Sequence, residues 1–182
     1  MGKRSLKILF IDETTHLDSI HDLNTQARGG MVSSLFIVPN ELREHGHSVT
    51  VKTDIKQSGM TDAGVIWIND NSYLKENFDV AVFNRQTLDG LPELNTRHRV
   101  LWTHDLPHHG FIPHPKTIKA FSATVFMSKY AERVWREYYK HIGRSFQIPN
   151  GVDKDLFKPL EKDKNLIIFA SPPDRDWETM MR

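Results

Sequence analysis

Short apolar runs recur along the chain, and each ends in polar residues. The runs are KILFID (7–12), SVTVKTD (48–54), GVIWIND (64–70), DVAVFNR (79–85), RVLWTHD (99–105), ATVFMSK (123–129), SFQIPNG (145–151) and NLIIFAS (165–171). Most of them are near-continuous rather than alternating, which is typical of strands that are covered on both faces in a parallel sheet. Such a sheet needs helices on both of its sides.

Helical patterns lie between some of these runs. A helix is expected near residues 31–42, with an apolar face formed by Met31, Leu35, Val38 and Leu42. Pro39 removes a backbone donor there and is expected to kink the helix. Residues 115–121 predict a short helix. Residues 129–141 predict a longer one, whose buried stripe is Ala131, Val134, Trp135 and Tyr138.

The order of these elements predicts an α/β protein with an open, doubly wound (Rossmann-like), mostly parallel sheet. We expect residues 1–151 to form this domain. Residues 152–164 are polar, contain Pro159 and are expected to be an interdomain linker. Residues 165–182 hold one strand pattern, a turn and the start of a helix. This piece cannot bury its own apolar faces, so it is expected to be the truncated start of a second domain or to pack on the first.

Composition excludes several classes of protein. With 182 residues, 38% of them hydrophobic, the chain is long enough for one domain with a core. Its 24 basic and 23 acidic residues nearly balance, so we expect no nucleic-acid partner. The absence of cysteine excludes disulfides and thiolate metal sites. No run approaches the roughly 20 apolar residues of a membrane span and no signal-peptide core is present, so we expect a cytoplasmic protein without a transmembrane segment.

Polar residues at the ends of the predicted strands define the candidate site. In an open parallel sheet, ligands bind outside the carboxyl ends of the strands. The residues at these ends are Asp12, Gly29, Gly30, His104, Asp105, Ser128, Lys129, Asn150 and Gly151. If the strands are as predicted, all of these residues lie along one edge of the sheet.

The connection from Glu13 to Arg28 is long for a strand–helix loop and is expected to be a lid or a binding segment. Gly29 and Gly30 then begin a helix whose first amides are unpaired and carry partial positive charge. An anionic or hydroxyl-rich ligand suits such a turn. The alternative is that the glycines only make a tight turn. No G-x-G-x-x-G follows the first strand, which disfavours a simple dinucleotide site.

Four histidines gather in WTHDLPHHGFIPHP, at positions 104, 108, 109 and 114. Neutral imidazoles bind zinc or nickel, and Asp105 could join them, but the spacing fits no helical pair and two prolines predict an irregular loop. We therefore predict no metal site. His104 directly follows a buried strand, so it is the candidate to bind a substrate hydroxyl or to carry a proton. The alternative is a core histidine satisfied by a backbone carbonyl.

Arg175 lies in SPPDRDW, between an apolar strand and a predicted helix. A guanidinium beside free helix amides can hold a diphosphate through two parallel hydrogen bonds. The alternative is an exposed arginine that pairs with Asp174 or Asp176.

Taken in order, these segments resemble the GT-B glycosyltransferases, in particular retaining family 4. GGMVSSLFIVPNELREHGHSVTV is similar to the glycine loop, helix and second strand of the amino-terminal domain of that family. VLWTHD is similar to the strand that carries a histidine to the acceptor side, and VFMSKYAERVW to the strand–serine–helix segment. IPNGVDKDLFKP resembles the crossover between the two domains, and NLIIFASPPDR the first strand and donor-phosphate loop of the second.

The resemblance implies an acceptor-side domain that takes part in sugar transfer from a nucleotide-sugar to a glycan, lipid or small-molecule acceptor, with retention of configuration. It implies His104 as the catalytic residue, Gly29 and Gly30 around the acceptor and sugar, and Ser171 and Arg175 at the donor phosphates. Asp105, Ser128 and Asn150 join the acceptor side by the strand-end rule. No metal or other cofactor is implied. The chain alone is expected to be inactive because most nucleotide contacts of the family lie in the second domain.

Two other functions compete with this one. A non-catalytic α/β module could use the same edge to bind a nucleotide or a sugar. A metal-dependent hydrolase could be built on the histidine loop. The sequence does not identify the sugar, the base of the nucleotide or the acceptor. It also leaves the oligomeric state open, a homodimer included.

Overall fold

The structure is a computed structural model that describes residues 4–21, 30–85, 93–107, 113–151 and 158–166. The chain divides into two compact units, Met1–Gly151 and Val152–Arg182. In the second unit, residues 158–166 are exposed and irregular apart from a turn in which the N–H of Leu166 donates to the carbonyl of Asp163. Most of the strand expected at 165–171 lies outside the described residues.

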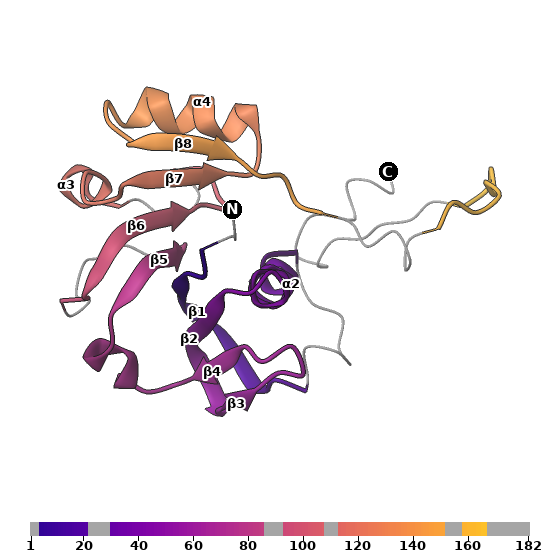
Figure 1. The fold of residues 1–182 in the computed structure, drawn as a ribbon. Helices are drawn as coiled ribbons and strands as arrows, with labels where there is room; N and C mark the ends of the chain where they lie inside the picture. Colours follow the sequence, from indigo (N-terminus) through magenta and orange to yellow (C-terminus); the bar gives the residue numbers. More distant parts are fainter. Residues whose placement is uncertain (1–3, 22–29, 86–92, 108–112, 152–157, 167–182) are drawn as a thin grey trace. The chain divides into compact units, whose positions relative to one another are not determined.

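The first unit is built on an eight-stranded sheet (Figure 1). Its strands are β1 (Lys7–Ser19), β2 (Ser48–Gln57), β3 (Gly59–Met60), β4 (Ile66–Ile68), β5 (Phe78–Asn84), β6 (Thr96–Trp102), β7 (Ala123–Phe126) and β8 (Arg144–Gln147). They lie in the order β3-β4-β2-β1-β5-β6-β7-β8, and each pair is parallel except β3 with β4. The mostly parallel α/β sheet predicted from the sequence is confirmed, whereas the two-residue β3 was not predicted.

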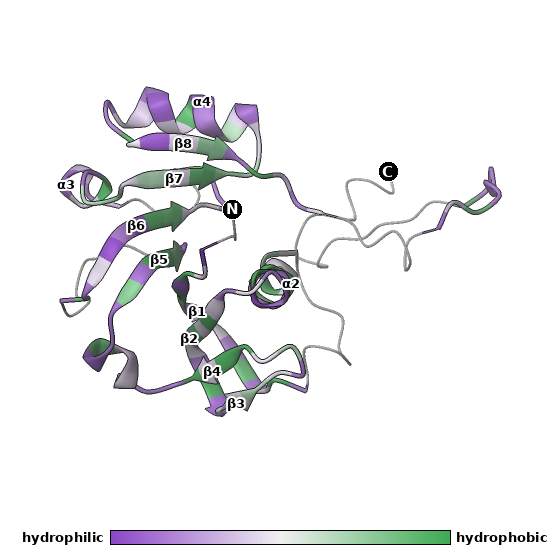
Figure 2. Ribbon diagram, in the orientation of Figure 1, coloured by the Kyte–Doolittle hydropathy of each residue, from purple (hydrophilic) through white to green (hydrophobic). Residues whose placement is uncertain are grey.

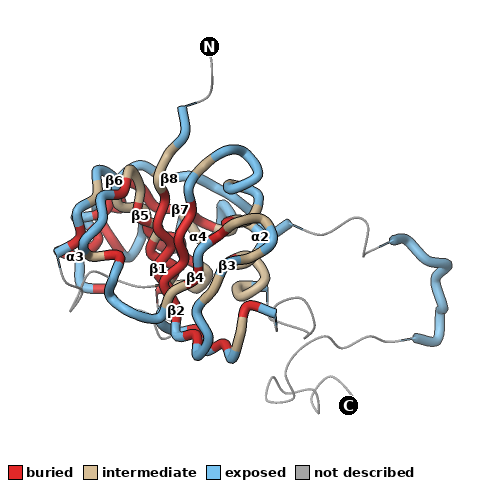
Figure 3. The backbone as a smooth tube through the Cα atoms, turned by 60° about the horizontal axis from the view of Figure 1, so that its bottom comes forward, coloured by how far each residue is buried: buried red, intermediate tan, exposed pale blue. Residues whose placement is uncertain are grey.

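Helices cover both faces of this sheet. They are α2 (Gly30–Glu44), α3 (Pro115–Ile118) and α4 (Lys129–Tyr138), with a 3-10 turn, η1 (Ser72–Lys75), before β5. Leu35 of α2 shares one buried cluster with Phe10, whereas Trp135 of α4 shares another with Ile11, the next residue of β1. Adjacent residues of a strand point to opposite faces, so α2 and α4 lie on opposite sides. The covered strand β7 is accordingly mostly apolar in Figure 2 and buried in Figure 3, whereas β8 at the edge of the sheet is more polar and largely exposed.

The helix α2 extends past the predicted residues 31–42 and ends at Glu44. The N–H of Gly46 donates to the carbonyl of Arg43 (3.0 Å), and the N–H of His47 to the carbonyl of Leu42 (3.1 Å). This pair of bonds is a Schellman motif, which needs a left-handed residue, and Gly46 has a φ of +91°. Pro39 lies inside α2, and the helix continues past it to Glu44.

β1 is longer than predicted, because residues 13–19, which were expected to begin a lid or binding segment, belong to the strand; residues 22–28 of that connection lie outside the described residues. The backbone bulges between Asp12 and His16, because the N–H groups of Thr14 and Thr15 donate to the Asp12 side chain. Pairing with β2 then resumes and ends with Ser19 opposite Gln57. Thr15 and Leu17 are buried while their neighbours are exposed, an alternation that the polar sequence TTHLDS conceals.

The buried stripe of α4 also differs from the prediction. Trp135 is fully buried, but Tyr138 is 53% exposed. The helix ends at Tyr138, and Tyr139 turns inward to stack on Trp135 and to donate its hydroxyl to the carbonyl of Pro113 at 2.7 Å. The prediction that Tyr138 is buried was wrong, because the helical spacing was extended past the end of α4, and Tyr139 is buried instead. No helix in the described part of the chain is long and apolar enough to cross a bilayer.

Candidate functional site

The strand order contains a reversal next to β1. From β1 the chain runs through α2 to β2 and then to β4, before it returns to β5 on the other side of β1. In open α/β sheets, ligands bind at such a reversal, outside the carboxyl ends of the two strands that flank it. Asn84 ends β5, Asp12 lies at the bulge of β1 just past the residues that pair with β5, and the segment after β6 lies beside Asn84.

Asp12 is a fully buried carboxylate with many donors. Its Oδ1 accepts from the Thr14 N–H (2.8 Å), the Thr14 hydroxyl (2.8 Å) and the Thr15 N–H (3.1 Å). Its Oδ2 accepts from the Thr15 hydroxyl (3.1 Å) and from Nδ2 of Asn84 (2.5 Å). A buried charge is tolerated only when it is compensated in this way, so Asp12 organises the backbone and side chains around it.

Asn84 connects Asp12 to His104. The Asn84 side chain is fully buried, and its Oδ1 lies 2.8 Å from Nε2 of His104. Asp12 of β1, Asn84 of β5 and His104, which follows β6, thus form a continuous hydrogen-bonded chain, which we call the Asp–Asn–His chain. His104, the residue predicted as catalytic, is thus held by Asn84, which was not predicted, and through Asn84 by Asp12, which was predicted only as a strand-end residue.

His104 is held firmly at this edge. The backbone N–H and the hydroxyl of Thr103 both donate to the carbonyl of Val125 (3.0 and 3.3 Å), which ties the segment to β7. The imidazole packs on the ring of Trp102, with 4.9 Å between centroids. Burial lowers the pKa of His104 to about 4, with Asp105 opposing and Arg85 adding to the shift, so the ring is neutral at pH 7.

Arg85 extends the site toward α2. Its Nε lies 2.8 Å from Oδ2 of Asp105, and its Nη1 donates to the sulfur of Met31 in the first turn of α2 (3.2 Å). Arg85 has a φ of +60°, which is uncommon for a residue with a Cβ and costs about 1–2 kcal/mol. Non-glycine residues held in this conformation cluster at functional sites.

Gly30 and Asn150 come together at the start of α2. The Ser34 hydroxyl donates to the Gly30 carbonyl (2.8 Å) and to Oδ1 of Asn150 (3.3 Å). A Cβ at Gly30 would lie 3.6 Å from Nδ2 of Asn150, an ordinary contact. The expected reason for a glycine at this position, close approach of a ligand to the backbone, therefore finds no steric support among the described residues.

The remaining predicted residues are placed as follows. Asp105 joins the site through Arg85, and its carbonyl accepts the indole N–H of Trp135 at 3.0 Å. Ser128 caps α4, accepting the N–H of Ala131 at 3.1 Å, and is not in contact with the Asp–Asn–His chain. Gly29, Ser171 and Arg175 lie outside the described residues.

The histidine loop is described only at its two ends. His104 is in the Asp–Asn–His chain, and Nδ1 of His114 accepts the N–H of Lys116 (3.2 Å) at the start of α3. His108 and His109 lie outside the described residues. Within the described ranges, no three histidine, aspartate or glutamate side chains gather as a metal site.

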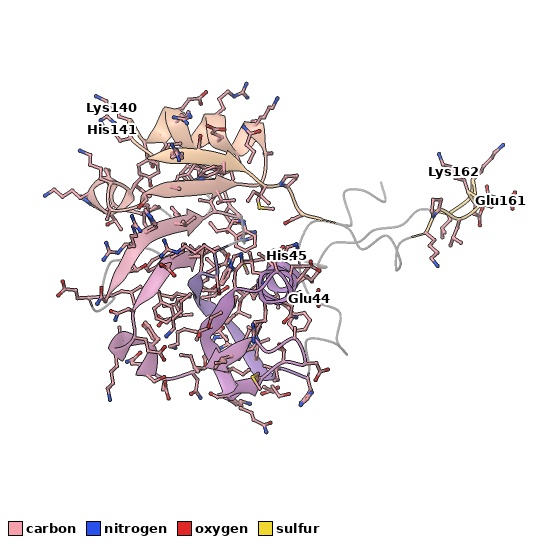
Figure 4. All side chains as sticks on the ribbon, in the orientation of Figure 1. Glu44, His45, Lys140, His141, Glu161 and Lys162 are labelled. Carbon is pink, nitrogen blue, oxygen red and sulfur yellow. The ribbon has the colours of Figure 1, made fainter. Side chains whose placement is uncertain are left out.

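Cavities among the described residues also lie away from this edge. One of about 230 Å³ lies between α2 and the β3–β4 segment. Another of about 320 Å³ lies at the amino-terminal ends of β7 and β8, and its lining includes Lys119, Arg136, Lys140 and His141. Figure 4 labels Lys140 and His141. Lys119 and Lys140 follow the last turns of α3 and α4, where helix carbonyls favour positive charge, so no ligand is needed to explain these two lysines.

Sequence reasoning placed Asp12 at a strand end without giving it a role, and it missed Asn84 and Arg85 as site residues. The run DVAVFNR ends in Asn84 and Arg85 as RVLWTHD ends in His104 and Asp105, so the strand-end rule already contained this signal. The strand-end rule does not predict which strand ends are adjacent in the sheet.

Comparisons of this chain with protein-family models, with curated proteins and with solved structures give no match. The chemistry of the site is therefore derived from its geometry. The strand ends present a neutral imidazole on a buried carboxylate–amide support, with an arginine–aspartate pair beside it. Such a site can accept or donate single hydrogen bonds and can carry a proton.

Proposed function

We propose that the first unit is the acceptor-side domain of a GT-B glycosyltransferase of the retaining family 4 type. It takes part in the transfer of a sugar from a nucleotide-sugar to a glycan, lipid or small-molecule acceptor. The single observation that carries the proposal is the Asp–Asn–His chain at the reversal between β1 and β5, with the start of α2 joined to it through Arg85.

The roles follow from this arrangement. His104, neutral at pH 7, forms hydrogen bonds with sugar hydroxyls rather than pairing with the diphosphate. The first amides of α2 and Asn150 face the same ligand from the other side of the site. Ser171 and Arg175 contact the donor phosphates, a role supported by the sequence resemblance alone. Neither a metal nor another cofactor is part of this proposal.

The test uses the protein at the natural length of its gene and measures release of nucleoside diphosphate from a panel of nucleotide-sugars. We expect release with at least one donor, and we expect His104→Ala to lower kcat/KM by roughly 10²-fold or more. The matched control is His98→Ala, because His98 is exposed in the amino-terminal half of the same strand.

Equal rates for wild type and His104→Ala would reject the role of His104. Saturable binding of a nucleotide-sugar without turnover would favour the non-catalytic binding module instead.

A further inference from the structure

We infer that Asp12 and Asn84 are positioning residues that hold His104 as the tautomer protonated on Nε2, so that Nδ1 is the ring nitrogen offered to a ligand. The inference concerns the same site as the proposed function and deepens it. It rests on three contacts: the hydrogen bonds of Asp12, the contact between Asp12 and Asn84, and the contact between Asn84 and His104.

Asp12 determines which atoms donate and which accept along the Asp–Asn–His chain. Its Oδ1 accepts two backbone N–H groups, which can only donate, and its Oδ2 lies 2.5 Å from the Asn84 amide. An ionised carboxylate has no proton to give, so the amide must present Nδ2 to it. The amide oxygen of Asn84 then faces His104.

The orientation of Asn84 decides the tautomer. Its Oδ1 lies 2.8 Å from Nε2 of His104, and an oxygen there can only accept. If Nε2 were unprotonated, two acceptors would face each other at hydrogen-bond distance. A flipped amide would move that conflict to the Asp12 carboxylate. Only one arrangement satisfies all three residues at once when Asp12 is ionised.

The consequence is that the two ring nitrogens of His104 have different roles. Within the described residues, the hydrogen bonds of His104 engage only Nε2. Nδ1 therefore keeps its lone pair, which accepts a hydrogen bond from a hydroxyl and repels a phosphate oxygen. The His104 ring also packs at a tilt against Trp102, which restricts its rotation.

The experiment is nitrogen-15 NMR of the imidazole of His104 in the purified chain at pH 7, which requires no substrate. We expect the proton on Nε2, favoured over the other tautomer by about tenfold, as one hydrogen bond of ordinary strength supplies. Asn84→Ala is expected to weaken this preference to the smaller one that a free imidazole has. The matched control is Asn69→Ala, because the Asn69 amide also bonds across strand ends, to the Ile55 carbonyl, but does not touch His104.

A double variant separates positioning from folding. Exchanging the two groups, with Asp12→Asn and Asn84→Asp together, lets the new amide donate to the new carboxylate, which accepts from Nε2. We expect this double variant to restore the preference for the Nε2-protonated tautomer that Asn84→Ala weakens.

A proton on Nδ1 in the wild type, or an unchanged tautomer ratio in Asn84→Ala, would overturn the inference. These results do not depend on any enzymatic activity. If the tautomer is as inferred but no nucleotide-sugar is turned over, the proposed function fails while the positioning role of Asp12 and Asn84 stands.

Discussion

Two carboxylates of the first unit each collect several hydrogen bonds, but in different surroundings. Asp12 is fully buried and is served by Thr14, Thr15 and Asn84. Glu132 of α4 accepts from its helix neighbour Arg136 and from two residues of β8, as follows: Arg136 Nε at 2.9 Å, Ser145 Oγ at 2.6 Å and Gln147 Nε2 at 2.6 Å.

The two carboxylates differ in whether water can replace their hydrogen-bond partners. The partners of Glu132 are largely at the surface, and Arg136 is 52% exposed, so solvent screens and substitutes these interactions. No solvent reaches Asp12, whose loss would leave buried donors unpaired. The hydrogen bonds of Glu132 therefore contribute little to the stability of the contact between α4 and β8. Those of Asp12 contribute more, and they fix the arrangement of the residues around His104.

The largest effect is expected from Asp12→Ala. Because several buried donors lose their acceptor, the free energy of unfolding should fall by about 4 kcal/mol in urea titrations. Asp12→Asn keeps an oxygen for the Thr14 and Thr15 amides and should cost about half as much. A cost for Asp12→Ala as small as that of Glu132→Ala would erase the contrast between the two regions.

The next effect is the acid response of His104. Its pKa is about 4 in the folded chain against an ordinary value of 6.5, so between these pH values the unfolded state binds more protons. Stability should therefore fall as pH drops from 6.5 to 4, by up to about 3 kcal/mol. His104→Gln should lose this part of the acid response in urea titrations made across that range. His98→Gln, on the exposed part of β6, should retain it.

The smallest effect is expected at Glu132. Its hydrogen bonds with Ser145, Gln147 and Arg136 lower its pKa from 4.5 to about 2. The folded state therefore holds the carboxylate ionised, and its stabilisation is present above pH 4.5 and lost as pH falls toward 2. Glu132→Gln should cost about 1 kcal/mol at pH 7, measured in urea.

The two stability curves, wild type and Glu132→Gln, should converge on acidification. A gap that stays constant down to pH 2 would show that Glu132 acts through packing rather than through charge.

The fold was predictable where burial is encoded locally. The runs that became β1, β2, β5, β6 and β7 are apolar because both of their faces are covered, and that coverage leaves a continuous hydrophobic pattern in the sequence. Prediction failed where the pattern is weak: in the polar continuation of β1, in the two-residue β3 and at the last turn of α4.

The candidate site was predictable as a set of strand ends and not as a set of contacts. His104, Asp105, Gly30 and Asn150 were selected because polar residues follow apolar strands. Asn84 has the same sequence context as His104, yet its importance arises from lying between Asp12 and His104.

The sequence by itself determined the class of fold, since alternating apolar strands and amphipathic helices leave few layered arrangements. Only the tertiary structure decided that Asp12 and Asn84, 72 residues apart, form a hydrogen bond. The order of the strands depends on how the helices pack on the two faces of the sheet. This packing joins segments that are far apart in the sequence, so no local sequence pattern predicts it. The state of His104 depends on that order, because its proton is placed by a carboxylate two strands away.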